Sequence, residues 1–216
     1  MAGAMTTARV PVGPDDIATV RIDLVGSDPP IWRQIEAPTS TTLLTLHRII
    51  QVAMGWQEYH MWEFVVGNQR YGIAGDADDW GAPPTIDAGK VRLSELLRPR
   101  KTIIDYTYDF GDDWEHRLTI TDIRPGEAGV AYPRYVTGER PAPPEDSGGV
   151  PGFYDKLETL ADPRRPEHKE IAEWLGGYDP EVLNELPIRY GIGRIAARRN
   201  AAKGPRGKRA ANAATG

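Results

Sequence analysis

Two alternating segments joined by a short acidic turn constrain the fold of this chain more than any other feature. Apolar and polar residues alternate over 103–110 and again over 114–123, with Gly111, Asp112 and Asp113 between them. Alternation with a period of two places every second side chain on the same face of a β-sheet. The pattern therefore predicts an antiparallel hairpin with one buried face.

Similar patterns predict the other elements. Residues 39–42 supply an N-cap, residues 43–53 place their apolar side chains on one helical face, and Gly55 ends that helix. The remaining elements are expected as strands at 18–25, 31–35, 61–66, 70–73 and 132–136, a helical turn at 94–97, helices at 153–160, 166–175 and near 180–186, and loops at 75–89 and 138–149.

The order of these elements contains few parallel crossovers. An α+β fold, with an antiparallel or mixed sheet covered by helices, is therefore favoured over a doubly wound fold. A chain of 216 residues is long enough for a single compact domain. We expect a disordered N-terminus over 1–16, the domain over 17–188 and a disordered basic tail over 189–216.

The absence of cysteine excludes several classes of site. A disulfide framework, a thiolate zinc site, an iron–sulfur cluster and a cysteine nucleophile all require a residue that this chain lacks. A bound divalent metal, the one cofactor we consider, would need His, Asp and Glu as ligands. No apolar run approaches the roughly 18 residues that span a bilayer, and no secretory leader is evident. We therefore expect a cytoplasmic protein with no membrane partner.

The charge is distributed unevenly. Eight bases and no acids follow Glu185, so the preceding residues carry 18 bases and 31 acids, a net charge of −13. The basic tail predicts nonspecific binding to nucleic-acid phosphates, although such tails also occur without a defined partner. The candidate contacts are Arg194, Arg198, Arg199, Lys203, Arg206, Lys208 and Arg209.

The segment 105–116 contains five carboxylates, one histidine and four aromatic residues. In a hairpin, Asp109, Asp112 and His116 could converge near the turn, where they would suit Mg²⁺, Mn²⁺ or Zn²⁺. The same residues, together with Glu145, are the catalytic candidates for acid–base chemistry. The alternative is ordinary turn and strand chemistry with no site.

The segment 138–154 forms a second acidic block. Gly148 and Gly149 could present backbone amides to an anion, whereas Glu145 and Asp146 favour a cation or an arginine. The alternative is a connection whose acids cap the next helix. Of the other histidines, His60 is the binding candidate because it precedes a strand at a loop junction.

Several ordered motifs together resemble the plasmid Ri (pRiA4b) ORF-3-like family. The resemblance spans about residues 18–185 and is carried by Ile31-Trp32-Arg33, Leu46-His47, Gly55-Trp56, His60 ahead of Phe64, and the stretches 108–116 and 143–149. It implies a compact α+β domain of bacteria and archaea, often beside mobile elements and sometimes labelled a transposon passenger or resolvase-like protein. It implies no particular activity, so the question of enzyme or non-enzyme stays open.

We therefore carry forward three hypotheses. The first is a ligand- or protein-binding domain associated with mobile elements, whose cleft has walls of Trp32, Trp56, Tyr108 and Trp114 and takes a basic peptide. The second is a divalent-metal hydrolase or nuclease that uses Asp109, Asp112, His116, Glu145 and His60. The third is nonspecific nucleic-acid binding through the basic tail. No phosphate-binding loop, dinucleotide motif, GxSxG or HExxH supports another class.

Overall fold

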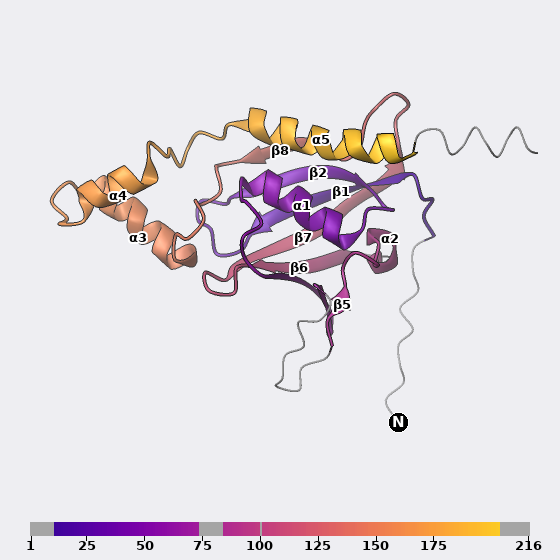
Figure 1. Cartoon of the computed structure of the whole chain (residues 1–216), viewed down its shortest axis with the longest axis horizontal. Helices are drawn as coiled ribbons and strands as arrows, with labels where there is room; N and C mark the ends of the chain where they lie inside the picture. The colour runs from indigo at the N-terminus through magenta and orange to yellow at the C-terminus, as the bar shows by residue number, and fades with distance from the viewer. Residues whose placement is uncertain (1–10, 74–83, 100, 204–216) are drawn as a thin grey trace, which may run out of the picture.

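The computed structural model describes residues 11–73, 84–99 and 101–203. A mixed sheet forms its centre (Figure 1). Its strand order is β5-β4-β3-β6-β7-β1-β2-β8. The strands are β1 (Asp16–Leu24), β2 (Trp32–Pro38), β3 (Trp62–Val66), β4 (Gln69–Gly72), β5 (Ile86–Asp87), β6 (Thr102–Tyr108), β7 (Trp114–Pro125) and β8 (Arg134–Glu139). The helices are α1 (Leu43–Met54), α2 (Leu93–Leu96), α3 (Gly149–Ala161), α4 (His168–Leu175) and α5 (Glu185–Lys203). The predicted α+β class is confirmed.

The predicted hairpin is confirmed as β6 and β7. These strands pair antiparallel, with Tyr108 opposite Trp114 and Tyr106 opposite His116. Because side chains alternate between the two faces, these four aromatic and imidazole rings all lie on the buried face. The turn residues that follow Tyr108 project from the end of the sheet instead.

Helix α1 covers one face of the sheet (Figure 1). Thr42 caps its first turn by accepting a hydrogen bond from the Thr45 amide, and Gly55 ends it in the left-handed region at φ 84°. The fully buried residues Leu46, Ile49 and Ile50 lie on the helix face that packs into the core. This helix therefore fixes the position of the loop that follows it and leads into β3.

The expected disorder of the basic segment 189–216 is wrong as far as Lys203. Residues 189–203 belong to α5, which contacts α1 and β8. Ile188, Ile192 and Ala196 form a buried stripe at helical spacing, which the arginine-rich composition obscured. Gly191 allows the close packing, because a Cβ there would lie 2.6 Å from Val52 Cγ1 on α1. Residues 204–216 lie outside the described part.

The expected boundaries change at two other places. Residues 11–15 belong to the ordered domain, since Val12 packs against the core and Thr39 Oγ1 donates to the Gly13 carbonyl oxygen. The expected disorder over 1–10 concerns residues outside the described part. Part of the loop expected at 75–89 is strand β5, which pairs in parallel with β4. None of the helices in the described ranges has the length and hydrophobicity needed to cross a bilayer.

Candidate functional site

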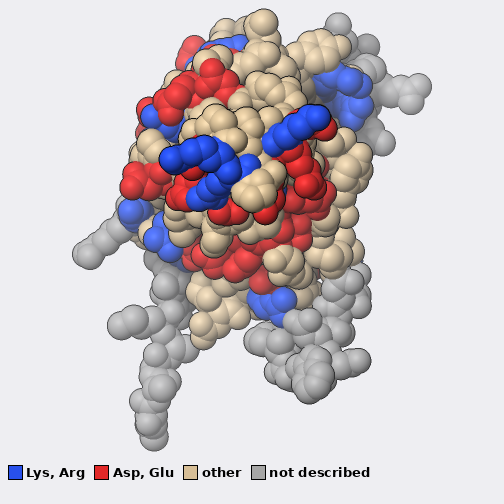
Figure 2. All heavy atoms as spheres, turned by 90° about the vertical axis from the view of Figure 1, so that its left-hand side faces the viewer, with Lys and Arg blue, Asp and Glu red and all other residues tan. Residues whose placement is uncertain are grey.

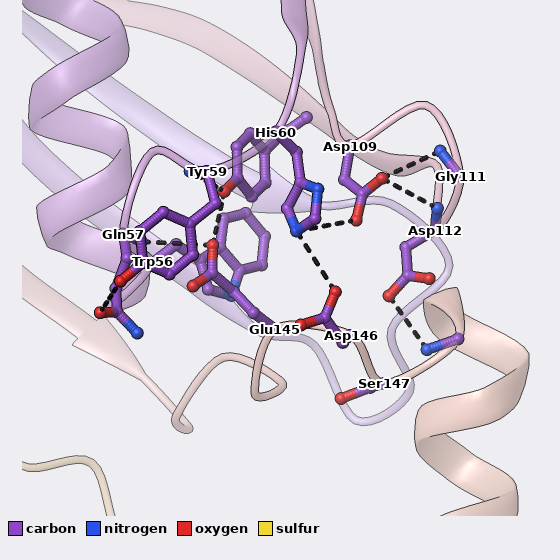
Figure 3. Close-up of polar contacts among 12 residues, drawn as sticks. Trp56, Gln57, Tyr59, His60, Asp109, Gly111, Asp112, Glu145, Asp146 and Ser147 are labelled. Atoms are coloured by element: carbon purple, nitrogen blue, oxygen red, sulfur yellow. Dashed lines mark hydrogen bonds and ion pairs between the residues drawn. The ribbon is translucent and has the colours of Figure 1, made fainter.

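Three segments meet at the end of β6. They contribute His60 from the loop before β3, Asp109 from the turn after β6, and Asp146 from the loop before α3 (Figure 3). His60 Nε2 lies 3.5 Å from Asp109 Oδ2 and 3.3 Å from Asp146 Oδ1. One ligand atom from each residue lies within 4.8 Å of the other two. We call these three residues the His60 cluster.

The backbone of the β6–β7 turn orients Asp109. This residue has a φ of 57°, a left-handed conformation that Asp tolerates better than most residues. Its amide donates to the Met61 carbonyl oxygen at 2.8 Å, and its Oδ1 accepts from the amides of Gly111 at 2.9 Å and Asp112 at 3.4 Å. The other oxygen, Oδ2, is therefore left facing His60.

The two acidic blocks lie against each other. Asp112 Oδ2 accepts a hydrogen bond from the Gly148 amide at 3.0 Å (Figure 3). A Cβ on Gly149 would lie 2.3 Å from the Asp112 carbonyl oxygen, so only glycine permits this approach. Asp112 and the two glycines thus join the loops, and the Gly148 amide that could have bound an anion is already occupied.

Glu145 is held in place by hydrogen bonds from Tyr108 and Gln57. Its Oε1 accepts from Tyr108 Oη at 2.5 Å and from the Gln57 amide at 3.2 Å. Burial, followed by this hydrogen bond to Glu145, raises the pKa of Tyr108. Glu145 therefore ties the second loop to the core beside the His60 cluster.

Four rings form what we call the aromatic floor, consisting of Trp56, Tyr108, Trp114 and His116. The Trp56 ring lies 5.1 Å from Tyr108, 5.8 Å from Trp114 and 5.2 Å from His116 between centroids. All four are buried, so the expected cleft walls of Trp56, Tyr108 and Trp114 are core residues instead. Trp32 lies on β2, where its ring contacts Arg21 and its Nε1 donates to Glu139.

His116 belongs to this floor and not to the expected set with Asp109 and Asp112. It is 1% exposed, and its Nδ1 donates to the Trp114 carbonyl oxygen at 2.9 Å. Burial lowers its pKa to about 4, which keeps the ring neutral at physiological pH. The alternation of β7 places His116 on the buried face, whereas Asp109 and Asp112 lie in the turn. Among the described residues, His60 is the histidine that meets Asp109.

Comparison with known proteins identifies the family. The pattern of the plasmid pRiA4b ORF-3-like proteins matches residues 16–186, which include the whole His60 cluster. The chain belongs to this family. It is 32% identical over 185 residues to the uncharacterized protein y4hQ of Sinorhizobium fredii, covering 84% of this chain and 93% of that relative.

A solved structure shares the fold of this family member. The crystal structure of MM3350, a protein of unknown function from Methanosarcina mazei Go1, matches with a TM-score of 0.72 and 35% sequence identity. The match covers 78% of this chain and 95% of that chain. These relatives support the family and the fold, and their descriptions assign no activity.

A cleft of about 600 Å³ adjoins the His60 cluster and includes His60 and Asp109 in its lining. Large apolar side chains are exposed along it, namely Tyr59, Met61, Ile73 and Phe110. Asp and Glu side chains are spread over the end of the molecule that carries α3 and α4, with Lys and Arg side chains among them (Figure 2). The family member therefore places a cleft with exposed apolar side chains next to a cluster of one imidazole and two carboxylates.

The candidate nucleic-acid contacts separate into two groups. Arg194, Arg198, Arg199 and Lys203 lie on α5, and Arg199 donates to Ser40 Oγ at 3.1 Å. The candidates Arg206, Lys208 and Arg209 lie outside the described residues. The ordered arginines thus occupy fixed places on the domain surface.

Proposed function

We propose that this protein is a divalent-metal-dependent enzyme of the hydrolase class, with His60, Asp109 and Asp146 as its metal ligands. The separation of their ligand atoms carries this proposal. Ligand atoms about 2.1 Å from a metal and 90–110° apart lie roughly 3.0–3.4 Å from each other. The separations of 3.3 and 3.5 Å from His60 Nε2 lie at the upper end of this spacing, and all three ligand atoms lie within 4.8 Å of one another, so a bound metal would draw the two carboxylates slightly closer.

The ligand types favour particular metals. One imidazole nitrogen and two carboxylate oxygens suit Zn²⁺ or Mn²⁺ better than Mg²⁺ or Ca²⁺, which prefer oxygen ligands alone. Catalytic zinc sites use three protein ligands and leave a position open for water or substrate. A metal held in this way would lower the pKa of its bound water and supply a nucleophile for hydrolysis.

The state of His60 supports the same proposal. Its Nε2 atom is buried and has no hydrogen-bond partner among the described residues, although two carboxylates lie close to it. A buried nitrogen that makes no hydrogen bond costs free energy, and metal coordination would remove that cost. The hydrogen bonds from Gly111 and Asp112 to Asp109 would act as the outer shell that orients a ligand carboxylate.

The cleft beside the cluster indicates the kind of substrate. Its exposed apolar side chains would hold an apolar group, and the surrounding acids would disfavour an anionic one. We therefore expect neutral or cationic substrates that carry an apolar or aromatic substituent next to the bond that is cleaved.

Calorimetric titration with Zn²⁺ and with Mn²⁺ tests this function. We expect binding of one ion per chain. His60→Ala, which removes a ligand, and Asp109→Asn, which replaces a charged ligand by a neutral amide, should each weaken it about 100-fold. The matched control is His168→Ala, which removes a histidine on α4 outside the cluster and should leave the affinity unchanged. Absence of binding to the unaltered protein at millimolar metal would overturn the proposal.

A second candidate function is binding of a basic peptide in the same cleft. The observation that favours it is the exposure of Tyr59 and Phe110, at 72% and 51%, beside acidic residues. Capture of basic peptides should weaken with salt and with Phe110→Ser, but not with Tyr190→Ser, which removes an exposed aromatic ring on α5. Equal effects of the two variants would remove this candidate.

A further inference from the structure

A second cleft, of about 370 Å³, lies between the start of α1 and the C-terminal half of α5. Its polar lining consists of hydroxyl and guanidinium groups, from residues 40–42, Thr45, Arg48, Arg198 and Arg199. Among the residues that the structure describes, no carboxylate contributes to this lining. Its chemistry is therefore opposite to that of the acidic His60 cluster.

The three arginines are held to different degrees. Arg199 is the most enclosed, with a side chain that is 23% exposed and bonded to Ser40 Oγ, and its contact with Asp15 is 4.0 Å long. Arg48 lies 3.8 Å from Glu58 on the side of the larger cleft. Arg198 is exposed and forms no ion pair with the described residues. The cleft thus concentrates positive charge that nearby acids offset only weakly.

A buried hydroxyl points to a ligand in addition to this charge. Thr41 is 5% exposed, it lines the cleft, and its Oγ1 has no hydrogen-bond partner in the described part of the chain. Buried hydroxyl groups are normally hydrogen-bonded, so a group without a partner calls for an explanation. A bound ligand that offers hydrogen-bond acceptors would provide that partner.

A ligand in this cleft would be bound by the side chains of its lining, and not by the backbone amides at the start of α1. The amides of Leu43, Leu44 and Thr45 already donate to Val91 O, Ala88 O and Thr42 Oγ1. The positive end of the α1 dipole still raises the potential in the cleft. Packing of α5 on α1, made possible by Gly191, brings Arg198 and Arg199 to this place.

We infer that this cleft binds a phosphate group. A phosphate offers several acceptor oxygens and at least one negative charge, which match guanidinium forks together with threonine hydroxyls. The phosphate of a small molecule and the phosphodiester of a nucleic acid share this chemistry. The inference is independent of the metal proposal, because the two clefts share Arg48 alone.

Titration of the full chain with inorganic phosphate, followed by calorimetry or amide NMR shifts, tests the inference. Arg198→Gln should weaken binding about tenfold by removing a charge-assisted hydrogen bond. The matched control is Arg194→Gln, which makes the same change one turn earlier on α5, outside the cleft lining, and should have little effect. Thr41→Val should weaken binding about threefold without loss of stability, because the hydroxyl makes no internal hydrogen bond.

Two results would overturn the inference. One is absence of phosphate binding up to about 10 mM, a concentration that corresponds to negligible affinity. The other is equal weakening by Arg198→Gln and Arg194→Gln, which would show general charge attraction and no site. Competition between phosphate and a short DNA duplex distinguishes the sources: competition indicates a nucleic-acid phosphate, and its absence a small phosphorylated ligand. His60→Ala should keep phosphate binding, so failure of either proposal can be recognised separately.

Discussion

The aromatic floor and the His60 cluster lie next to each other but differ in almost every physical property. His116 is 1% exposed among aromatic rings, and burial holds its pKa at about 4. The His60 side chain is 30% exposed and faces two carboxylates. Both histidines stand beside acidic sequence, yet one is buried in the core and the other faces two carboxylates at the edge of a cleft.

The position of a histidine in the sheet therefore decides whether its ring can contact a ligand. The density of acidic residues near it in the sequence does not. The buried face of β7 receives His116, and the turn that follows β6 receives Asp109. The floor should therefore control stability, and the cluster should control metal binding. Substitutions in the two regions should therefore separate these two roles.

Of the substitutions proposed for the two regions, Trp114→Ala should give the largest effect on stability. This ring is fully buried in the floor, and replacing a buried Trp by Ala costs about 3–5 kcal/mol. Urea unfolding measures the loss, and metal titration of the folded protein should show nearly unchanged affinity. Trp174→Ala is the control, because Trp174 is 44% exposed and should cost about 1 kcal/mol or less. Similar losses for the two variants would contradict the role of the floor.

Acid should destabilise the protein through its two buried histidines. Burial lowers the pKa of His47 to about 3 and of His116 to about 4, whereas the unfolded value is near 6.5. Below pH 6.5 the unfolded chain therefore binds protons that the folded chain does not. The free energy of unfolding should fall, as the pH drops from 6.5 toward 4, by up to about 1.4 kcal/mol per pH unit for each histidine.

Urea unfolding at several pH values measures this slope. His47→Gln should reduce the slope contributed by the histidines by about half, because one of the two groups no longer titrates. The account of the floor would be wrong if the stability of the unaltered protein stayed constant between pH 6.5 and pH 5.

Gly149→Ala should give a smaller loss of stability than Trp114→Ala, but it should also lower metal affinity at the His60 cluster. An added Cβ would lie 2.3 Å from the Asp112 carbonyl oxygen, and the φ of 67° adds strain, for a total of about 1–3 kcal/mol. The loop that carries Asp146 should shift, so metal affinity should fall as well. Gly129→Ala is matched in its positive φ but has nothing within 4 Å, so it isolates the steric contribution. Equal thermal unfolding of the two variants would show that the two loops do not need this contact.

Local pattern predicted much of the fold because alternation and helix caps are local signals. The β6–β7 hairpin and the stop of α1 at Gly55 follow from them directly. The buried stripe on α5 was equally local, but the arginines between Ile188, Ile192 and Ala196 led to a wrong prediction of disorder. Composition is a weaker guide than the spacing of apolar residues.

The site was harder to predict because it depends on loops that lie far apart in the chain. His60, Asp109 and Asp146 were each identified from their own surroundings, but only the folded backbone brings them together. The contact between Gly149 and the Asp112 carbonyl oxygen has no local signal beyond the glycine itself. The sequence therefore identified the individual residues of the His60 cluster, but not that these three lie together.

The most direct test of the central claim is an anomalous-scattering map of crystals soaked in Zn²⁺ or Mn²⁺. The account predicts one strong peak about 2.0–2.3 Å from His60 Nε2, Asp109 Oδ2 and Asp146 Oδ1, and no peak at His116. A map without a peak at the His60 cluster, or with the metal bound elsewhere, would contradict it.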